Sequence, residues 1–166
     1  NKSHFFINYL KNFDSSESIN NNLEVNLQHV SDKKYLKLYK IDSNLVNYET
    51  EVLENYIDYS RFDEDKNSFF SLNLSSFRTL ADTYNDKYEY ILPEINYEKQ
   101  LFSNNFGYGN LGTNIKVHNY DTNKYSKFFT NDLDWIIEKP FSEKIFDGKL
   151  LTKFKNINYE VKNINA

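Results

Sequence analysis

Three histidines are the residues of this chain whose type could most readily support chemistry. His4, His29 and His118 lie far apart, and no HExxH spacing places two of them on one helix face. His118 could partner Asp121 in the stretch HNYD, but a histidine at a strand end or in a turn is the commoner case. The absence of cysteine excludes disulfides, thiolate zinc sites and cysteine nucleophiles. The sequence therefore predicts no metal, no cofactor and no catalytic histidine.

A glycine-rich stretch is the second candidate for a functional site. Gly107, Gly109 and Gly112 in FGYGNLG satisfy the GxGxxG spelling of a dinucleotide site. That motif binds a dinucleotide only where it follows a strand and opens a helix, and here it opens an alternating strand over residues 113–120. Glycines that relieve crowding at a hairpin or a bent strand are the better interpretation. With no GxSxG nucleophile motif and no distinctive carboxylate pair, we expect no enzyme.

Composition limits the classes of protein to which the chain could belong. The 166 residues carry 20 Lys and Arg against 24 Asp and Glu, an acidic balance that argues against nucleic acid. Aromatic residues make up 17% of the chain, too many for a disordered protein. The chain contains no Met, so we expect a processed product or a fragment. A mean hydropathy of −0.75 leaves a transmembrane barrel open, because such strands need only every second residue to be apolar.

The clearest signal is alternation of period two, which is typical of a strand with one apolar and one polar face. In residues 19–30, Leu23, Val25 and Leu27 alternate with polar neighbours. The pattern returns in residues 91–98, where Ile91, Pro93, Ile95 and Tyr97 share one parity, and again in residues 111–118 and 129–138. We predict about eight strands, over residues 3–13, 19–30, 50–62, 69–80, 89–101, 107–120, 125–139 and 147–162.

Polar clusters separate these strands, among them residues 14–18, 63–67, 82–87, 121–123 and 142–148. Residues 31–49 do not alternate, and we expect a long loop there with one helical turn. In residues 147–162 the apolar parity changes, which predicts a bulge near Lys155 or Asn156. Strands of this length favour a barrel wall over a sandwich. The predicted fold is all-β, with antiparallel up-and-down strands that form a barrel wall, and the family resemblance given below implies that this wall is part of a large outer-membrane barrel.

The aromatic residues near strand ends have two interpretations. They could form a stacking platform for oligonucleotides or sugars. They fit better an aromatic girdle at the membrane interface, formed by Phe5, Phe6, Tyr9, Phe13, Tyr59, Phe62, Tyr97, Phe102, Tyr120 and Phe128.

Three stretches resemble a known family. The stretches are KYEYILPEINYEKQLF at 87–102, FGYGNLGTNIKVHNY at 106–120 and FFTNDLDWIIEK at 128–139. The resemblance is to the middle of the barrel in the LPS-assembly family LptD, also called organic solvent tolerance protein, and most closely to its alphaproteobacterial members. The residues that carry the resemblance are Leu92, Pro93, Glu94, Tyr97, Gly112 and Trp135. The family's periplasmic jelly-roll domain, paired cysteines and terminal gate strands have no counterpart here. Residues 1–166 are therefore expected to be one internal segment of a barrel domain, without a second domain.

The resemblance implies transport without catalysis, in which lipopolysaccharide passes through a barrel in the outer membrane to the outer leaflet. It also implies a periplasmic transport bridge, an LptE-like lipoprotein plug and the barrel-assembly machinery as partners. The strand phases predict that nine residues face the polar lumen: Glu24, Asn26, Gln28, Glu94, Asn96, Glu98, Lys116, Asp132 and Asp134. Among them, Lys116 is a candidate for binding phosphate groups. The alternatives are a soluble β-rich carbohydrate-binding or surface-adhesion module and another outer-membrane porin or receptor.

Overall fold

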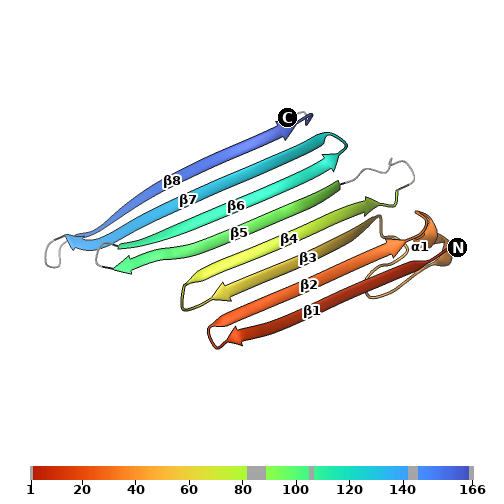
Figure 1. Ribbon diagram of the computed structural model, residues 1–166, viewed down its shortest axis with the longest axis horizontal. Helices are drawn as coiled ribbons and strands as arrows, with labels where there is room; N and C mark the ends of the chain where they lie inside the picture. Colours follow the sequence, from red (N-terminus) through yellow and green to blue (C-terminus); the bar gives the residue numbers. More distant parts are fainter. Residues whose placement is uncertain (1, 82–88, 105–106, 142–145, 165–166) are drawn as a thin grey trace.

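A single antiparallel sheet of eight strands makes up almost the whole of the computed structural model. The structure describes residues 2–81, 89–104, 107–141 and 146–164, with the backbone alone for residues 102–104, 139–141, 146 and 147. The strands lie in chain order, β1 to β8, and each pairs with its neighbours in sequence (Figure 1). The predicted all-β, up-and-down arrangement of about eight strands is confirmed.

The strands are long and agree with the expected ranges to within three residues at either end. They are β1 (His4–Ser16), β2 (Ile19–Val30), β3 (Val52–Asp63), β4 (Ser68–Thr79), β5 (Glu89–Asn104), β6 (Gly107–Asp121), β7 (Lys124–Phe141) and β8 (Phe146–Lys162). The expected helical turn is α1 (Tyr35–Tyr39), and no helix in the described ranges has the length and apolar character to cross a membrane. The turn expected at 82–87 and most of that at 142–148 lie outside the described residues.

One side of the sheet, the apolar face, collects the apolar parity of β1 to β7 and of the N-terminal half of β8, because directly paired residues point to the same side. A central row runs Leu23, Tyr59, Leu72, Ile95, Ile115, Phe129 across six strands. Rows on either side add further members: Ile7, Tyr9, Val25, Leu27, Ile57, Leu74, Phe70, Tyr97, Leu111, Leu133, Trp135, Leu150 and Phe154.

The opposite side, the polar face, carries the other parity. One row runs Glu24, Asp58, Asn73, Glu94, Lys116, and the next runs Asn22, Ser60, Ser71, Asn96, Asn114, Thr130. The two faces therefore differ in chemistry from β1 to β7, whereas the C-terminal half of β8 places Asn156, Asn158 and Glu160 on the apolar face.

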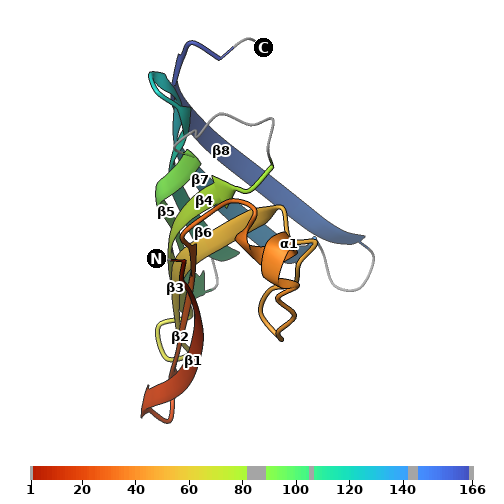
Figure 2. The ribbon, with the colours of Figure 1, turned by 90° about the vertical axis from the view of Figure 1, so that its right-hand side faces the viewer.

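The sheet is a single layer, and no second layer covers the apolar face within the described part of the chain (Figure 2). Phe129, Leu133 and Trp135, in the middle of β7, remain 39–40% exposed. The described buried hydrophobic side chains form one small cluster, Val30, Tyr35, Leu36, Val46, Leu53 and Leu80, at one end of the sheet. A water-soluble domain normally buries such a face against another layer.

The strands are staggered as well as paired. A register row that starts at Asp14, close to the end of β1, reaches Asp132 in β7, and from there β7 continues to Phe141. Each successive hairpin is consequently displaced in the same direction, as Figure 1 shows. A stagger of this kind tilts the strands, which is a requirement for closing a sheet into a barrel.

Two details of the alternation were predicted wrongly. The predicted bulge near Lys155 or Asn156 is absent, because β7 and β8 pair without a register shift from Tyr125 to Phe141. Ile157, Tyr159 and Val161 therefore lie on the polar face. In β5 the register shifts between Ile91 and Glu94, and Ile91 pairs with Ser75 and His118 on the polar face rather than sharing the side of Ile95. Pro93 lies within this shift, where its missing N–H removes no ladder bond.

Candidate functional site on the polar face

All nine residues predicted to face a lumen lie on the polar face. Cross-strand pairs connect Glu24 to Lys116 in one row, Asn96 to Asn114 in the next, and Glu98 through Gly112 to Asp132 in a third. Asn26 and Gln28 share the side of Glu24 in β2, and Asp134 shares that of Asp132 in β7. The structure thus brings these residues onto one surface, while their orientation toward a lumen remains a prediction.

Side chains on this face bond to one another across strands. The Tyr56 hydroxyl and the Asn8 amide both donate to Glu24 Oε1, the latter at 3.4 Å. The Asn96 amide donates to Ser71 Oγ at 3.2 Å, and the Asn114 amide donates to Asn96 Oδ1. The face therefore presents a hydrogen-bonded layer of amides, hydroxyls and carboxylates, which a water-filled or sugar-binding surface requires.

Lysines neutralise the carboxylates of the second half of the sheet. Lys116 Nζ lies 3.0 Å from Glu94 Oε2, Lys155 Nζ 3.4 Å from Asp132 Oδ2, and Lys153 Nζ 3.5 Å from Asp134 Oδ2. At the far end of β7, Lys149 and Glu138 approach to 2.6 Å. Lys116, which was expected to be available for phosphate, is instead held by Glu94.

The first half of the sheet lacks such neutralisation. Glu24 and Asp58 are direct cross-strand partners, and neither has an ion pair among the described residues. In the second half, Glu98 of β5 also has no ion pair within the described ranges. Ten carboxylates lie on the strands of this face: Asp14, Glu24, Glu54, Asp58, Glu89, Glu94, Glu98, Asp132, Asp134 and Glu138. The polar face is therefore net negative.

A hollow of about 400 Å³ opens near Gly112, which has no side chain to fill it. The hollow is bordered by Phe62 and Phe69 on one side and by Glu98, Asp132 and Asp134 on the other. This hollow can hold a polar group against an aromatic edge.

The six residues behind the family resemblance do not assemble into one site. Glu94 and Gly112 lie on the polar face, Tyr97 and Trp135 lie on the apolar face, and Leu92 and Pro93 fall in the irregular part of β5. Glu94 contacts Lys116, and Gly112 pairs with Glu98 and Asp132. The motif residues therefore act as parts of the sheet rather than as a binding constellation.

The histidines make separate contacts. His4 Nδ1 lies 3.0 Å from the Tyr35 hydroxyl, His29 stacks on Phe5, and His118 Nε2 lies 3.1 Å from Glu89 Oε1. No group of three or more His, Asp or Glu side chains in the described ranges is arranged to hold a metal ion. Gly107, Gly109 and Gly112 all lie in strand β6, so the stretch does not open a helix as a dinucleotide motif would, and the predicted strand is confirmed.

The aromatic residues proposed for a girdle divide between the faces. Phe5, Tyr9, Phe13, Tyr59 and Tyr97 lie on the apolar face. Phe6, Phe62 and Phe128, together with Tyr120, lie on the polar side, contrary to a girdle directed only outward. The side chain of Phe102 lies outside the described residues.

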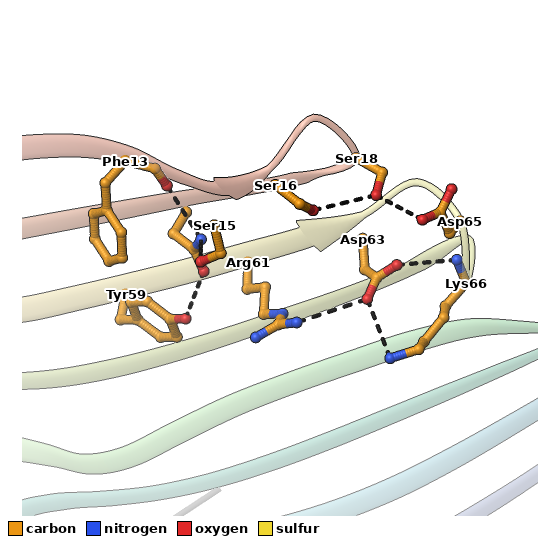
Figure 3. Close-up of polar contacts among 10 residues, drawn as sticks. Phe13, Ser15, Ser16, Ser18, Tyr59, Arg61, Asp63, Asp65 and Lys66 are labelled. Atoms are coloured by element: carbon orange, nitrogen blue, oxygen red, sulfur yellow. Dashed lines mark hydrogen bonds and ion pairs between the residues drawn. The ribbon is translucent and has the colours of Figure 1, made fainter.

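A charged cluster stabilises the β3–β4 turn (Figure 3). Asp63, with a side chain only 6% exposed, accepts the Lys66 backbone N–H at 3.0 Å and pairs with Arg61 at 3.7 Å and Lys66 Nζ at 3.5 Å. The Lys66 backbone hydrogen bond is the main reason that the pKa of Asp63 lies below its ordinary value, and the cations of Lys66 and Arg61 add to it. Ser18 joins the neighbouring turn through a 2.6 Å bond to Asp65.

Several polar-face residues were missed in the sequence, above all Tyr56, Asp58 and Asn73. They belong to strands β3 and β4, which were predicted as strands but whose parity was not used to assign faces. The available signal for the polar face was alternation in β3, where Glu54, Tyr56 and Asp58 share one parity and Asn55, Ile57 and Tyr59 share the other.

Comparison with known protein families, with curated proteins and with solved structures found no match to this chain.

Proposed function

We propose that the chain is a segment of the wall of an outer-membrane β-barrel, with the apolar face toward lipid and the polar face lining a water-filled interior. One observation carries the proposal: a single-layer sheet has one predominantly apolar face, with polar residues such as Arg61 and Asn131 and the Lys127–Glu160 ion pair near its margins, and one hydrogen-bonded polar face. Lipid covers an apolar face without a second protein layer, and water solvates the other. Both requirements are met by a barrel wall.

Strand length and stagger support the same proposal. A tilted transmembrane strand needs about 9–11 residues, and the strands here span 12 to 18 residues. The outer strands β1 and β8 each have one partner in the described sheet, so their outer edges carry unpaired backbone groups. Unpaired edges are not tolerated in a membrane, so in this proposal further strands pair with both edges.

The connections favour one orientation. At one end of the sheet the described connections are short, at positions 17–18 and 64–67. At the other end, residues 122–123 form one short turn, but residues 31–51 form a long connection that packs into a buried cluster with the strand ends. Outer-membrane barrels have short periplasmic turns and longer extracellular loops. We therefore place the β2–β3 connection on the outside.

The cargo proposed from the family resemblance is lipopolysaccharide. The amide and hydroxyl rows around Asn96 and Asn114 suit the hydroxyl groups of a sugar chain. In this proposal the chain works with an LptE-like lipoprotein plug and a periplasmic transport bridge, and the barrel-assembly machinery inserts it. The chain performs no catalysis.

A second candidate cargo is favoured by the charge of the polar face. Unneutralised carboxylates such as Glu24, Asp58 and Glu98 repel phosphate groups, and Lys116 is engaged by Glu94. A wall with this charge favours cationic or neutral solutes, as in a porin or receptor barrel. A soluble carbohydrate-binding module has less support, because it needs a closed core that the single layer does not provide.

The test uses the full-length protein that contains this segment, purified from outer membranes. A barrel keeps its fold in detergent and migrates differently before and after boiling. Depletion of a lipopolysaccharide transporter lowers the amount of lipopolysaccharide at the cell surface, whereas loss of a porin slows solute uptake and leaves surface lipopolysaccharide unchanged. A water-soluble monomer with no heat-modifiable migration contradicts the barrel proposal.

A further inference from the structure

The connection between β2 and β3, residues 31–51, folds onto the sheet instead of extending away from it. Figure 2 shows α1 on one side of the sheet, and in the same view β8 slants toward that side. We infer that residues 31–51 form a constriction segment that narrows the pathway along the polar face and sets the size of what passes. This inference rests on the proposed barrel wall.

The contacts of the constriction segment identify the face on which it lies. The Tyr35 hydroxyl lies 3.0 Å from His4 Nδ1, and the His4 ring stacks on Phe6 with centroids 5.1 Å apart. His4 and Phe6 share their side of β1 with Asn8, whose amide bonds to Glu24 on the polar face. The segment therefore occupies the side that a lumen would occupy.

The segment is fixed rather than loosely attached. Leu36 is 1% exposed and packs with Val30 and Leu53, both fully buried, in the only hydrophobic cluster of the described residues. Backbone bonds close each end, from Ser31 N to Ser3 O at 2.9 Å and from Leu80 N to Glu51 O at 2.7 Å. A segment that shares a buried core with the ends of the strands holds its position and can limit passage.

Strands β2 and β3 separate beneath the segment, and polar side chains bridge the gap. Their ladder stops at Asn26 and Tyr56 although β2 continues to Val30. Beyond that point Gln28 Oε1 accepts the Glu54 N–H at 3.1 Å, and the Asn26 amide donates to the Glu54 carbonyl at 2.7 Å. Arg78 donates to the Val30 carbonyl at 2.7 Å. These bonds satisfy backbone groups that the inward fold would otherwise leave unpaired.

The outer surface of the segment differs from the wall that it faces. Lys37 and Lys40 are exposed beside Leu38 and Tyr39, which are 61% and 51% exposed. The wall carries unneutralised carboxylates such as Glu24. Residues 31–51 as a whole carry as many carboxylates as lysines, so the buried cluster rather than net charge holds the segment against the sheet.

The test compares two substitutions in the full-length, membrane-inserted protein. Leu36→Asp places a charge in the buried cluster and should release the segment, whereas Leu38→Asp changes a neighbour that is already exposed. We expect L36D to raise the channel conductance several-fold, and to raise the size of the largest sugar that enters liposomes. L38D should have the same conductance and the same size limit as the unaltered protein. An L36D protein that protease cleaves within residues 31–51, but whose conductance is unchanged, overturns the inference.

A second variant covers the case in which L36D does not insert. Leu38→Cys, in a background free of other cysteines, is labelled with a bulky water-soluble maleimide, and the label should lower conductance at least two-fold. Unchanged conductance after complete labelling contradicts the constriction. The proposed function fails separately, if the unaltered protein neither shows heat-modifiable migration nor conducts.

Discussion

Glu24 of β2 and Asp58 of β3 are direct cross-strand partners on the polar face, with no lysine or arginine paired to either in the described part of the chain. The Tyr56 hydroxyl and Asn8 amide bond to Glu24, and the Asn73 amide bonds to Asp58 at 3.2 Å. Like charges directly opposite each other destabilise a sheet. Hydration from a water-filled interior, on our proposal, makes this pair tolerable.

Removing one of these charges should stabilise the sheet. Asp58→Asn keeps an oxygen that can accept from Asn73 and removes the repulsion, so the free energy of unfolding should rise by roughly 0.2–1 kcal/mol. Urea unfolding of the full-length barrel at low salt measures the change, and the gain should shrink at high salt. Glu94→Gln is the matched control, because it breaks the pair with Lys116 and should not stabilise the protein. A destabilised Asp58→Asn barrel would show that the charge is needed for folding.

The two faces should respond oppositely to a new positive charge. Leu72 lies in the central row of the apolar face, and Asn73 beside it lies on the polar face. Leu72→Arg should destabilise the membrane-inserted protein by about 2–4 kcal/mol, because it places a guanidinium in hydrocarbon. Asn73→Arg should cost far less. Reversible folding into liposomes compares the two, and equal costs would argue against a lipid-facing side.

Gly107 should not tolerate a side chain. Its φ is +101°, and a Cβ built there would lie 2.0 Å from the Ile136 carbonyl oxygen. Gly107→Ala should therefore destabilise the protein by about 1–3 kcal/mol or displace the start of β6. Gly112→Ala is the control, since the nearest atom to a Cβ there is Asp132 Cβ at 3.8 Å. Thermal unfolding in detergent distinguishes them, and equal midpoints would refute the close approach.

The β3–β4 turn should weaken in acid. Hydrogen bonding by Lys66 lowers the folded pKa of Asp63 below its unfolded value of about 3.9. The stabilisation is therefore complete above that value and is lost as pH falls through the folded pKa. Asp63→Asn should lower the unfolding midpoint at pH 7 and flatten its dependence on pH below 4. A variant with the same acid sensitivity as the unaltered protein would assign that sensitivity to other groups.

The strands could be predicted from sequence because alternation reports burial locally, residue by residue. Where a strand departs from a straight ladder, the local pattern fails. The shift around Pro93 reverses the side of Ile91, and β8 continues without a bulge although its apolar parity changes. The register with β7 decides which face each side chain of β8 lies on, and the sequence of β8 alone does not contain that register.

The candidate site was predictable in part for a related reason. Glu24 and Glu94 were assigned to the polar face from parity within their own strands. The opposition of Glu24 and Asp58 depends on the register between β2 and β3, which the 31–51 connection separates in sequence. The docking of Leu36 beside Val30 and Leu53 depends on tertiary packing, which periodicity does not report.

Cysteine accessibility along β7 tests the central claim most directly. Phe129 lies on the apolar face and Thr130 on the polar face, paired with Ile115 and Asn114 respectively. In the full-length protein inserted in lipid and free of other cysteines, Thr130→Cys should react with a water-soluble thiol reagent. Phe129→Cys should stay unreactive until boiling in detergent unfolds the protein. Equal reaction of both cysteines in intact membranes, or reaction of Phe129→Cys alone, would contradict a barrel wall with its apolar face in lipid.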